Sequence, residues 1–238
     1  MSLTVQRAAV SAALFCFLSL PLACREGAEP SGSGTPVPMQ LHFSPGVSFL
    51  YDAWAVNEYG YRLPSTRSRA LWRVIGVHAG PGDFSSVTTI LDSTSVLRDS
   101  AHVLDTLLLG AGQNGDVYRY GFLAEMARMR RQTGVPHLWD RIAALSLESG
   151  TSWLVGYLDA AGREPVYGRV SGAPEMFSVQ VNGEHTVYEG IRVDLSGPAF
   201  TYSYWLSDAP TSFLRFRFEP DNDTTGAEFN LSEIHSPP

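Results

Sequence analysis

The sequence of 238 residues contains no lysine, so all 17 of its basic residues are arginines. Chemistry that needs a lysine amine is therefore excluded, including Schiff-base formation, the lysine of a phosphate-binding loop and serine–lysine dyads. Cysteine is scarce as well, because the two cysteines, Cys16 and Cys24, both lie close to the N-terminus. The rest of the chain has no thiol for a disulfide, a thiolate nucleophile or a zinc–sulfur site.

Basic residues are fewer than acidic ones, and the formal net charge is −7 at pH 7. Residues 1–23 carry one charged side chain, Arg7, so their removal would leave the chain more acidic still. An acidic chain argues against a nucleic-acid partner, because phosphate binding needs a basic surface. No apolar run beyond the N-terminal one approaches the roughly 20 residues that a membrane-spanning helix requires.

The N-terminus combines Arg7, an uncharged run over residues 8–20 and small residues at a cleavage point, which is typical of a secretory signal. The segment Leu20-Pro21-Leu22-Ala23-Cys24 resembles the bacterial lipobox. This resemblance implies that residues 1–23 are a signal peptide and that Cys24 is lipidated, with acyl chains such as palmitate. Several acyl chains on one residue suffice for a stable membrane anchor.

Residues 24–40 are rich in glycine, proline and serine and poor in apolar side chains, so we expect a flexible tether behind the lipidated cysteine. Residues 41–238 are expected to form a single antiparallel β domain. Arg25 follows the cysteine in place of the aspartate that retains enterobacterial lipoproteins at the inner membrane. The resemblance therefore implies an exported protein of the cell envelope, anchored at the outer membrane and facing the periplasm.

Apolar and polar residues alternate along most of the remaining chain, which predicts strands with one buried face. The fold class is expected to be mainly β, a curved antiparallel sheet or half-barrel with one or two short helices. Asn182-Gly183 predicts a tight hairpin turn between two of the strands. The predicted strands are 47–56, 71–78, 87–97, 103–109, 117–122, 177–181, 187–195, 200–206, 214–218 and 227–234.

One convincing helix is predicted over residues 122–132, with Gly134 as the residue that ends it. Residues 138–145 fit a short helix or a strand equally well. The predicted helix carries Arg128, Arg130 and Arg131 beside two methionines. This basic patch is interpreted as a solvated helix face, with contact to lipid head groups or to a partner's carboxylates as the alternative.

The order of features after Gly150 is similar to that of exported bacterial β-sheet proteins of unknown function, whose sheets are distantly like lipoprotein-carrier half-barrels. The features are Gly150-Thr151-Ser152-Trp153, the segment 170–181, Gly190-Ile191-Arg192-Val193, Tyr204-Trp205-Leu206-Ser207 and Leu214-Arg215-Phe216. The resemblance implies a fold and a compartment. It supplies no catalytic residues.

Catalytic and metal-binding patterns are weak throughout. The six histidines share no metal-ligand spacing, and no serine lies in Gly-x-Ser-x-Gly, the turn that exposes a nucleophile above a sheet. We therefore predict no catalytic residue, no cofactor and no metal site. Aromatic residues on the predicted strands either fill the core or line an apolar cavity. The candidate ligand-lining residues are Trp72, Trp153, Tyr202 and Tyr204.

These observations favour a non-enzymatic lipoprotein of the cell envelope that binds a lipid or another apolar ligand. The alternative is a structural or interaction subunit that docks an envelope protein through a sheet edge or through the basic patch. An envelope hydrolase is a third hypothesis, which a cleft of clustered aspartate and histidine with shifted pKa values would favour.

Overall fold

The computed structural model describes residues 43–95, 102–144, 147–207, 213–220 and 225–237. Within the chain, residues 36–238 form one compact unit. The predicted signal peptide 1–23, the predicted lipid site Cys24 and the predicted tether 24–40 lie outside the described residues.

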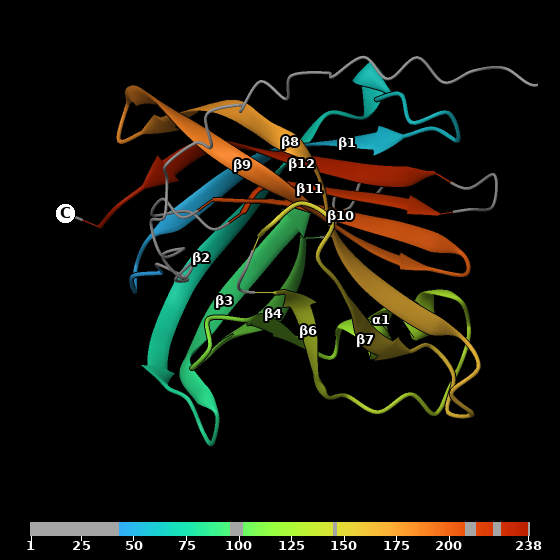
Figure 1. Ribbon diagram of the computed structural model, residues 1–238. Helices are drawn as coiled ribbons and strands as arrows, with labels where there is room; N and C mark the ends of the chain where they lie inside the picture. Colours follow the sequence, from blue (N-terminus) through green and yellow to red (C-terminus); the bar gives the residue numbers. More distant parts are fainter. Residues whose placement is uncertain (1–42, 96–101, 145–146, 208–212, 221–224, 238) are drawn as a thin grey trace, which may run out of the picture. The chain divides into compact units, whose positions relative to one another are not determined.

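The predicted mainly β fold is confirmed, because the described residues contain one twelve-stranded, largely antiparallel sheet together with one α-helix and one 3-10 turn (Figure 1). The helix α1 spans Phe122–Met129 and the turn spans Pro64–Thr66. The strands are β1 Ser48–Val56, β2 Ser68–Ala79, β3 Phe84–Ser95, β4 His102–Gly112, β5 Val117–Tyr120, β6 Trp139–Ala143, β7 Ser152–Tyr157, β8 Pro165–Val181, β9 Glu184–Gly197, β10 Phe200–Leu206, β11 Phe213–Pro220 and β12 Gly226–His235.

The sheet consists of two antiparallel meanders, a first one of β1–β6 and a second one of β7–β12. They are joined because the first strand of the chain pairs with the last. The strand order is β6-β5-β4-β3-β2-β1-β12-β11-β10-β9-β8-β7, so β1 pairs with β12 while β6 and β7 occupy the two ends of the order. The second meander also folds back on itself. Glu233 and Ile234 of β12 pair in parallel with Gln180 and Val181 of β8.

Period-two alternation places one face of each strand in the core, as β1 shows. Its residues alternate between buried and half-buried positions, with Phe49, Tyr51 and Ala53 on the buried side. The turn between β8 and β9 is the predicted Asn182-Gly183 hairpin. Both residues have positive φ, 50° and 92°, which is the backbone of a two-residue turn that matches the twist of the flanking strands.

The helix ends earlier than predicted, at Met129, and the expected role of Gly134 was wrong. Arg131 takes the left-handed conformation with φ 59°, and its N–H donates to the carbonyl of Arg128 at 2.9 Å. The N–H of Gln132 donates back to the carbonyl of Ala127 at 2.9 Å, which completes a Schellman ending. An arginine therefore takes the place that a glycine normally fills. The ambiguous segment 138–145 contains the strand β6.

Aromatic side chains from both meanders form the centre of the core. Tyr51 of β1 and Trp72 of β2 pack on Phe216 of β11, with ring centroids 5.1 and 4.6 Å apart. The Tyr51 hydroxyl donates a hydrogen bond to the carbonyl of Phe213 at 3.1 Å. Phe122 of α1 packs edge-on against Tyr202 of β10 at 5.7 Å, which fixes the helix on the same face. Among the described residues, no helix has both the length and the apolar character needed to cross a membrane.

The two ends of the strand order, β6 and β7, lie close to each other, and one side chain forms a hydrogen bond between them. The indole N–H of Trp153 on β7 donates to the carbonyl of Arg141 on the edge strand β6 at 3.0 Å. The indole lies directly over Gly168, where an added Cβ would come within 2.2 Å of the ring. Trp153 thus provides a hydrogen-bond donor for the Arg141 carbonyl on the edge strand β6, and its ring covers the backbone of the neighbouring strand β8.

We predict that Trp153→Phe destabilises the domain by about 1 kcal/mol, because it removes this hydrogen bond and leaves the Arg141 carbonyl unpaired while keeping an aromatic ring. Urea unfolding followed by circular dichroism measures the effect. An unchanged free energy of unfolding would show that the indole hydrogen bond does not hold the two edges together.

Candidate functional site

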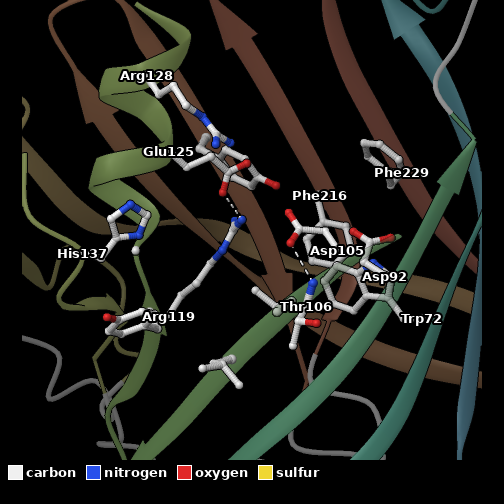
Figure 2. Close-up of a pocket in the computed structure, with 15 residues that line it drawn as sticks. Trp72, Asp92, Asp105, Thr106, Arg119, Glu125, Arg128, His137, Phe216 and Phe229 are labelled. Carbon is white, nitrogen blue, oxygen red and sulfur yellow. Dashed lines mark hydrogen bonds and ion pairs between the residues drawn. The ribbon is translucent and has the colours of Figure 1, made fainter. Parts of the chain in front are cut away.

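A cavity of about 530 Å³ lies between α1 and the sheet, lined by strands of both meanders (Figure 2). Its walls combine aromatic rings with charged side chains. The lining residues are Trp72, Asp92, Asp105, Thr106, Leu107, Leu108, Arg119, Tyr120, Gly121, Glu125, Arg128, His137, Tyr202, Phe216 and Phe229.

One wall of the cavity is aromatic. Trp72 packs against Phe216 at 4.6 Å, and Phe216 meets Phe229 edge-on at 6.3 Å. Phe216 is buried, whereas Trp72, Phe229 and Tyr202 are half-buried and present surface toward the cavity. These residues come from β2, β10, β11 and β12, so the pairing of β1 with β12 brings them together.

Opposite this wall, Arg119 of β5 forms an ion pair with Glu125 of α1 (Figure 2). The guanidinium also lies 5.6 Å from the centroid of the Phe122 ring. Burial by itself would lower the pKa of Arg119, but Tyr204 and the Glu125 carboxylate raise it above its usual range. The arginine is therefore charged, and it ties strand to helix beside the cavity.

Two carboxylates stand on the sheet side of the cavity. Asp92 of β3 is directly opposite Asp105 of β4 in the strand register, and Trp72 is opposite Asp92 on the other side. The Asp105 carboxylate accepts a hydrogen bond from the backbone N–H of Thr106 at 2.7 Å. Like charges that face each other across strands are destabilising, so packing alone does not favour this pair.

Two tyrosines of β10 lie beside the arginine. Burial raises the pKa of Tyr202 to about 12; Arg119 lowers it, while Glu125 and Asp92 raise it. Burial likewise raises the pKa of Tyr204 above its usual range. Both hydroxyls therefore stay neutral at physiological pH.

The start of α1 is fixed by a buried carboxylate on β6. Asp140 is 5% exposed, and it accepts a hydrogen bond from the backbone N–H of Leu123 at 2.9 Å. It thus takes the role of an N-cap, which Gly121 cannot provide through a side chain. Burial raises the pKa of Asp140 to about 6, against the lowering effect of the helix N–H groups and of Arg119.

The structure brings together some of the predicted ligand-lining residues. Trp72 and Tyr202 line the cavity, and Tyr204 is buried next to Tyr202 with its ring 4.8 Å away. Trp153 lies at the junction of β7 and β6 and is not among the residues that line the cavity.

Sequence reasoning missed the charged part of the cavity. Asp92 continues the buried face of Thr88 and Ile90, and Arg119 shares a face with the buried Val117. A charged residue at a position that the alternation assigns to the core was the signal available. The same reasoning treated the arginines of the helix as one patch. Arg128 lines the cavity, whereas Arg130 pairs with Glu164.

The cavity can hold a molecule by combining apolar contact with charge. Pockets of this size, with aromatic walls and a few polar groups, are typical of small-ligand sites. Among the described residues, no group of three or more His, Cys, Asp or Glu side chains is arranged to hold a metal ion.

We predict that stability rises as the pH falls through the pKa of Asp140. Its pKa of about 6 in the folded protein exceeds the value of 3.8 for an exposed carboxyl, so the folded state binds more protons between these values. At one pH unit below the folded pKa, the gain relative to pH 7.5 is about 1.4 kcal/mol.

Asp140→Asn keeps an oxygen that can accept the Leu123 N–H but does not titrate. The difference in unfolding free energy between pH 7.5 and pH 5, measured by urea denaturation, should therefore shrink by about 1.4 kcal/mol in this variant. Equal pH dependence in the two proteins would contradict the assignment.

No protein-family model and no curated protein matches the sequence. Among solved structures, the chain is similar to a "putative lipoprotein" from Parabacteroides distasonis, with 10% identity, coverage of 83% of this chain and 98% of that one, and a TM-score of 0.41. It is also similar to a "putative exported protein" from Bacteroides fragilis, with 7% identity, coverage of 84% and 100%, and a TM-score of 0.46.

Proposed function

We propose that this protein is an exported lipoprotein of the cell envelope, anchored through Cys24, and that its β domain binds an amphipathic ligand. The ligand would be a lipid or another apolar molecule that carries a polar or charged group. The observation that supports this proposal most directly is the cavity of about 530 Å³, which has aromatic residues on one side and charged residues on the other.

The aromatic wall suits the apolar part of such a ligand. Trp72 and Phe229 are half-buried, so a bound molecule would remove further apolar surface from water. Each square ångström of apolar surface that is buried contributes about 25 cal/mol. An aromatic wall contributes this without losing much side-chain entropy, because its rings are already packed against one another.

The charged groups suit the polar part. Arg119 is held in place by Glu125, and Arg128 reaches the same cavity from the next turn of α1 (Figure 2). Asp92 and Asp105 stand across from them on the sheet. A ligand with a head group that bears charge would interact with either side in a site that is partly shielded from water.

The anchor would place this cavity in the cell envelope. Residues 24–40 would separate the lipidated cysteine from the β domain, and Arg25 after the cysteine favours the outer membrane with the domain facing the periplasm. Docking of an envelope protein is the alternative, and absence of ligand binding in the experiment below would favour it.

We predict that the cavity binds a fluorescent fatty acid and that Asp105→Trp blocks it. Asp105 is exposed, lines the cavity and shares the face of Asp92, so a large side chain there would fill the space without removing a core residue. The experiment titrates a dansyl-labelled fatty acid into residues 36–238, after a cooperative thermal transition has shown that this part folds alone. Asp105→Trp should weaken binding by about tenfold or more.

Thr133→Trp is the matched control, because Thr133 is equally exposed and is not among the cavity-lining residues. It should leave the affinity unchanged. Equal weakening by both variants, or no binding by the unaltered domain at micromolar concentration, would contradict the proposal.

We predict that the full chain, expressed in a bacterium with an outer membrane, begins at Cys24 and carries acyl chains on that residue. Intact mass spectrometry of the detergent-extracted protein measures both features. Cys24→Ala should remove the added acyl mass and release the protein from the sedimenting outer-membrane fraction. A mature chain that starts elsewhere, or one that has no acyl mass, would overturn the anchor.

A further inference from the structure

The opposite face of the first meander carries a second recess of about 530 Å³, separate from the cavity beside α1. Three half-buried aromatic side chains, Phe84, Tyr118 and Trp139, line it. Neighbouring residues of a strand point to opposite faces, so Tyr118 lies on the other side of the sheet from the cavity residue Arg119. We propose that this recess is a binding site for a neutral oligosaccharide.

The rings form an aromatic cluster. Phe84 meets Tyr118 edge-on at 5.2 Å and Trp139 at 4.9 Å with the ring planes tilted by 45°. Tyr120, which also lines the cavity beside α1, lies edge-on to Trp139 at 5.4 Å. The rings lie directly on the backbone at Gly110, where an added Cβ would come within 2.7 Å of Phe84 and 3.2 Å of Trp139. The accessible face of such a half-buried ring can contact the C–H face of a sugar ring.

The rim of the recess supplies hydrogen-bonding groups. Asp83, Gln113 and Asn114 line it beside the rings, and all three are exposed. A carboxylate accepts hydrogen bonds from hydroxyl groups, and an amide both donates and accepts them. This mixture matches a ligand whose flat faces are apolar and whose edges carry hydroxyls.

The loops that carry the rim are held in position before any ligand arrives. The backbone N–H of Gln113 donates to the carbonyl of Asp83 at 2.9 Å, and its side-chain amide donates to the carbonyl of Gly82 at 3.3 Å. The Asn114 side chain accepts the N–H of Asp116 at 3.1 Å. Binding to such loops loses little conformational entropy.

The negative charge of Asp83 in the lining of the recess disfavours anionic ligands of similar size. Among the described residues that line the recess, Asp83 is the one charged side chain and none is basic. Anionic ligands such as phosphates or acidic sugars would be repelled by Asp83, and a purely apolar ligand would cover this carboxylate without offering it a hydrogen bond. A neutral, polyhydroxylated molecule meets both conditions.

The test uses the full chain in a non-ionic detergent that has no sugar head group. Chitotriose, maltotriose and cellotriose are offered separately at millimolar concentration, and binding is detected by saturation transfer from protein to sugar protons in NMR. We expect saturation of at least one trisaccharide. Trp139→Ala and Gln113→Ala should each weaken its binding by about tenfold.

Two control variants locate the effect. Tyr167→Ala removes an aromatic side chain that is 55% exposed on β8, away from the recess, and Asp105→Trp fills the cavity on the opposite face. Both should bind the sugar as the unaltered chain does. Gln113 lies on an exposed turn, so its variant tests the rim even if Trp139→Ala does not fold.

The proposal is overturned if none of the three trisaccharides receives saturation from the protein. It is equally overturned if Gln113→Ala binds as tightly as the unaltered chain, or if Asp105→Trp abolishes sugar binding. The last result would show that the sugar binds in the cavity beside α1. Failure of the fatty acid to bind in that cavity would not bear on the proposal that the recess binds a sugar.

Discussion

The antiparallel pairing of β1 with β12 is the constraint on which the rest of the structure depends. It aligns Phe49 with Ile234 and Ala53 with Phe229, and the Ser232 hydroxyl donates to the carbonyl of Leu50 at 2.9 Å. Because these partners lie at opposite ends of the domain's sequence, the entropy of closing almost the whole chain must be offset by this pairing and by the aromatic packing that it permits. Without it, Trp72 of the first meander and Phe216 of the second would not meet, and the cavity would lose one of its walls.

On the outer face of the sheet, several arginines surround a buried carboxylate, and a lysine would suit these positions less well. Glu228 is 3% exposed, accepts hydrogen bonds from Arg62 and lies 3.5 Å from both Arg215 and Arg217. Arg62 also stacks on Trp54, with its guanidinium carbon 4.4 Å from the ring centroid. A planar guanidinium can pair with a carboxylate and cover an aromatic ring simultaneously, which an ammonium group does less well. The buried carboxylate is tolerated because several donors surround it.

The sequence predicted most of the sheet, because alternation is a local signal that each strand carries by itself. It predicted the Asn182-Gly183 turn for the same reason. It could not predict that β1 pairs with β12 or that β6 and β7 lie at opposite ends of the strand order, since neither follows from local pattern. Gly134 was the expected helix end, yet Arg131 adopts the left-handed conformation, and the hydrogen bonds of Arg131 and Gln132 to the preceding turn accompany it. The candidate site was predicted in part, since Trp72 and Tyr202 line the cavity while its charged residues were missed.

The charged residues of the cavity argue that it is not simply a defect of packing. A core that had only to be stable would place apolar side chains where the half-buried Asp92 and Arg119 stand, because half-buried charges lose hydration. It would also not set the exposed Asp105 directly across from Asp92, because like charges across strands repel. Arg119 regains part of this loss from Glu125 and from the face of Phe122. Asp92 and Asp105 face each other in register beside the half-buried Trp72. Residues that cost stability persist where they serve another purpose, and a cavity with aromatic rings on one side and charges on the other suits the recognition of an amphipathic molecule.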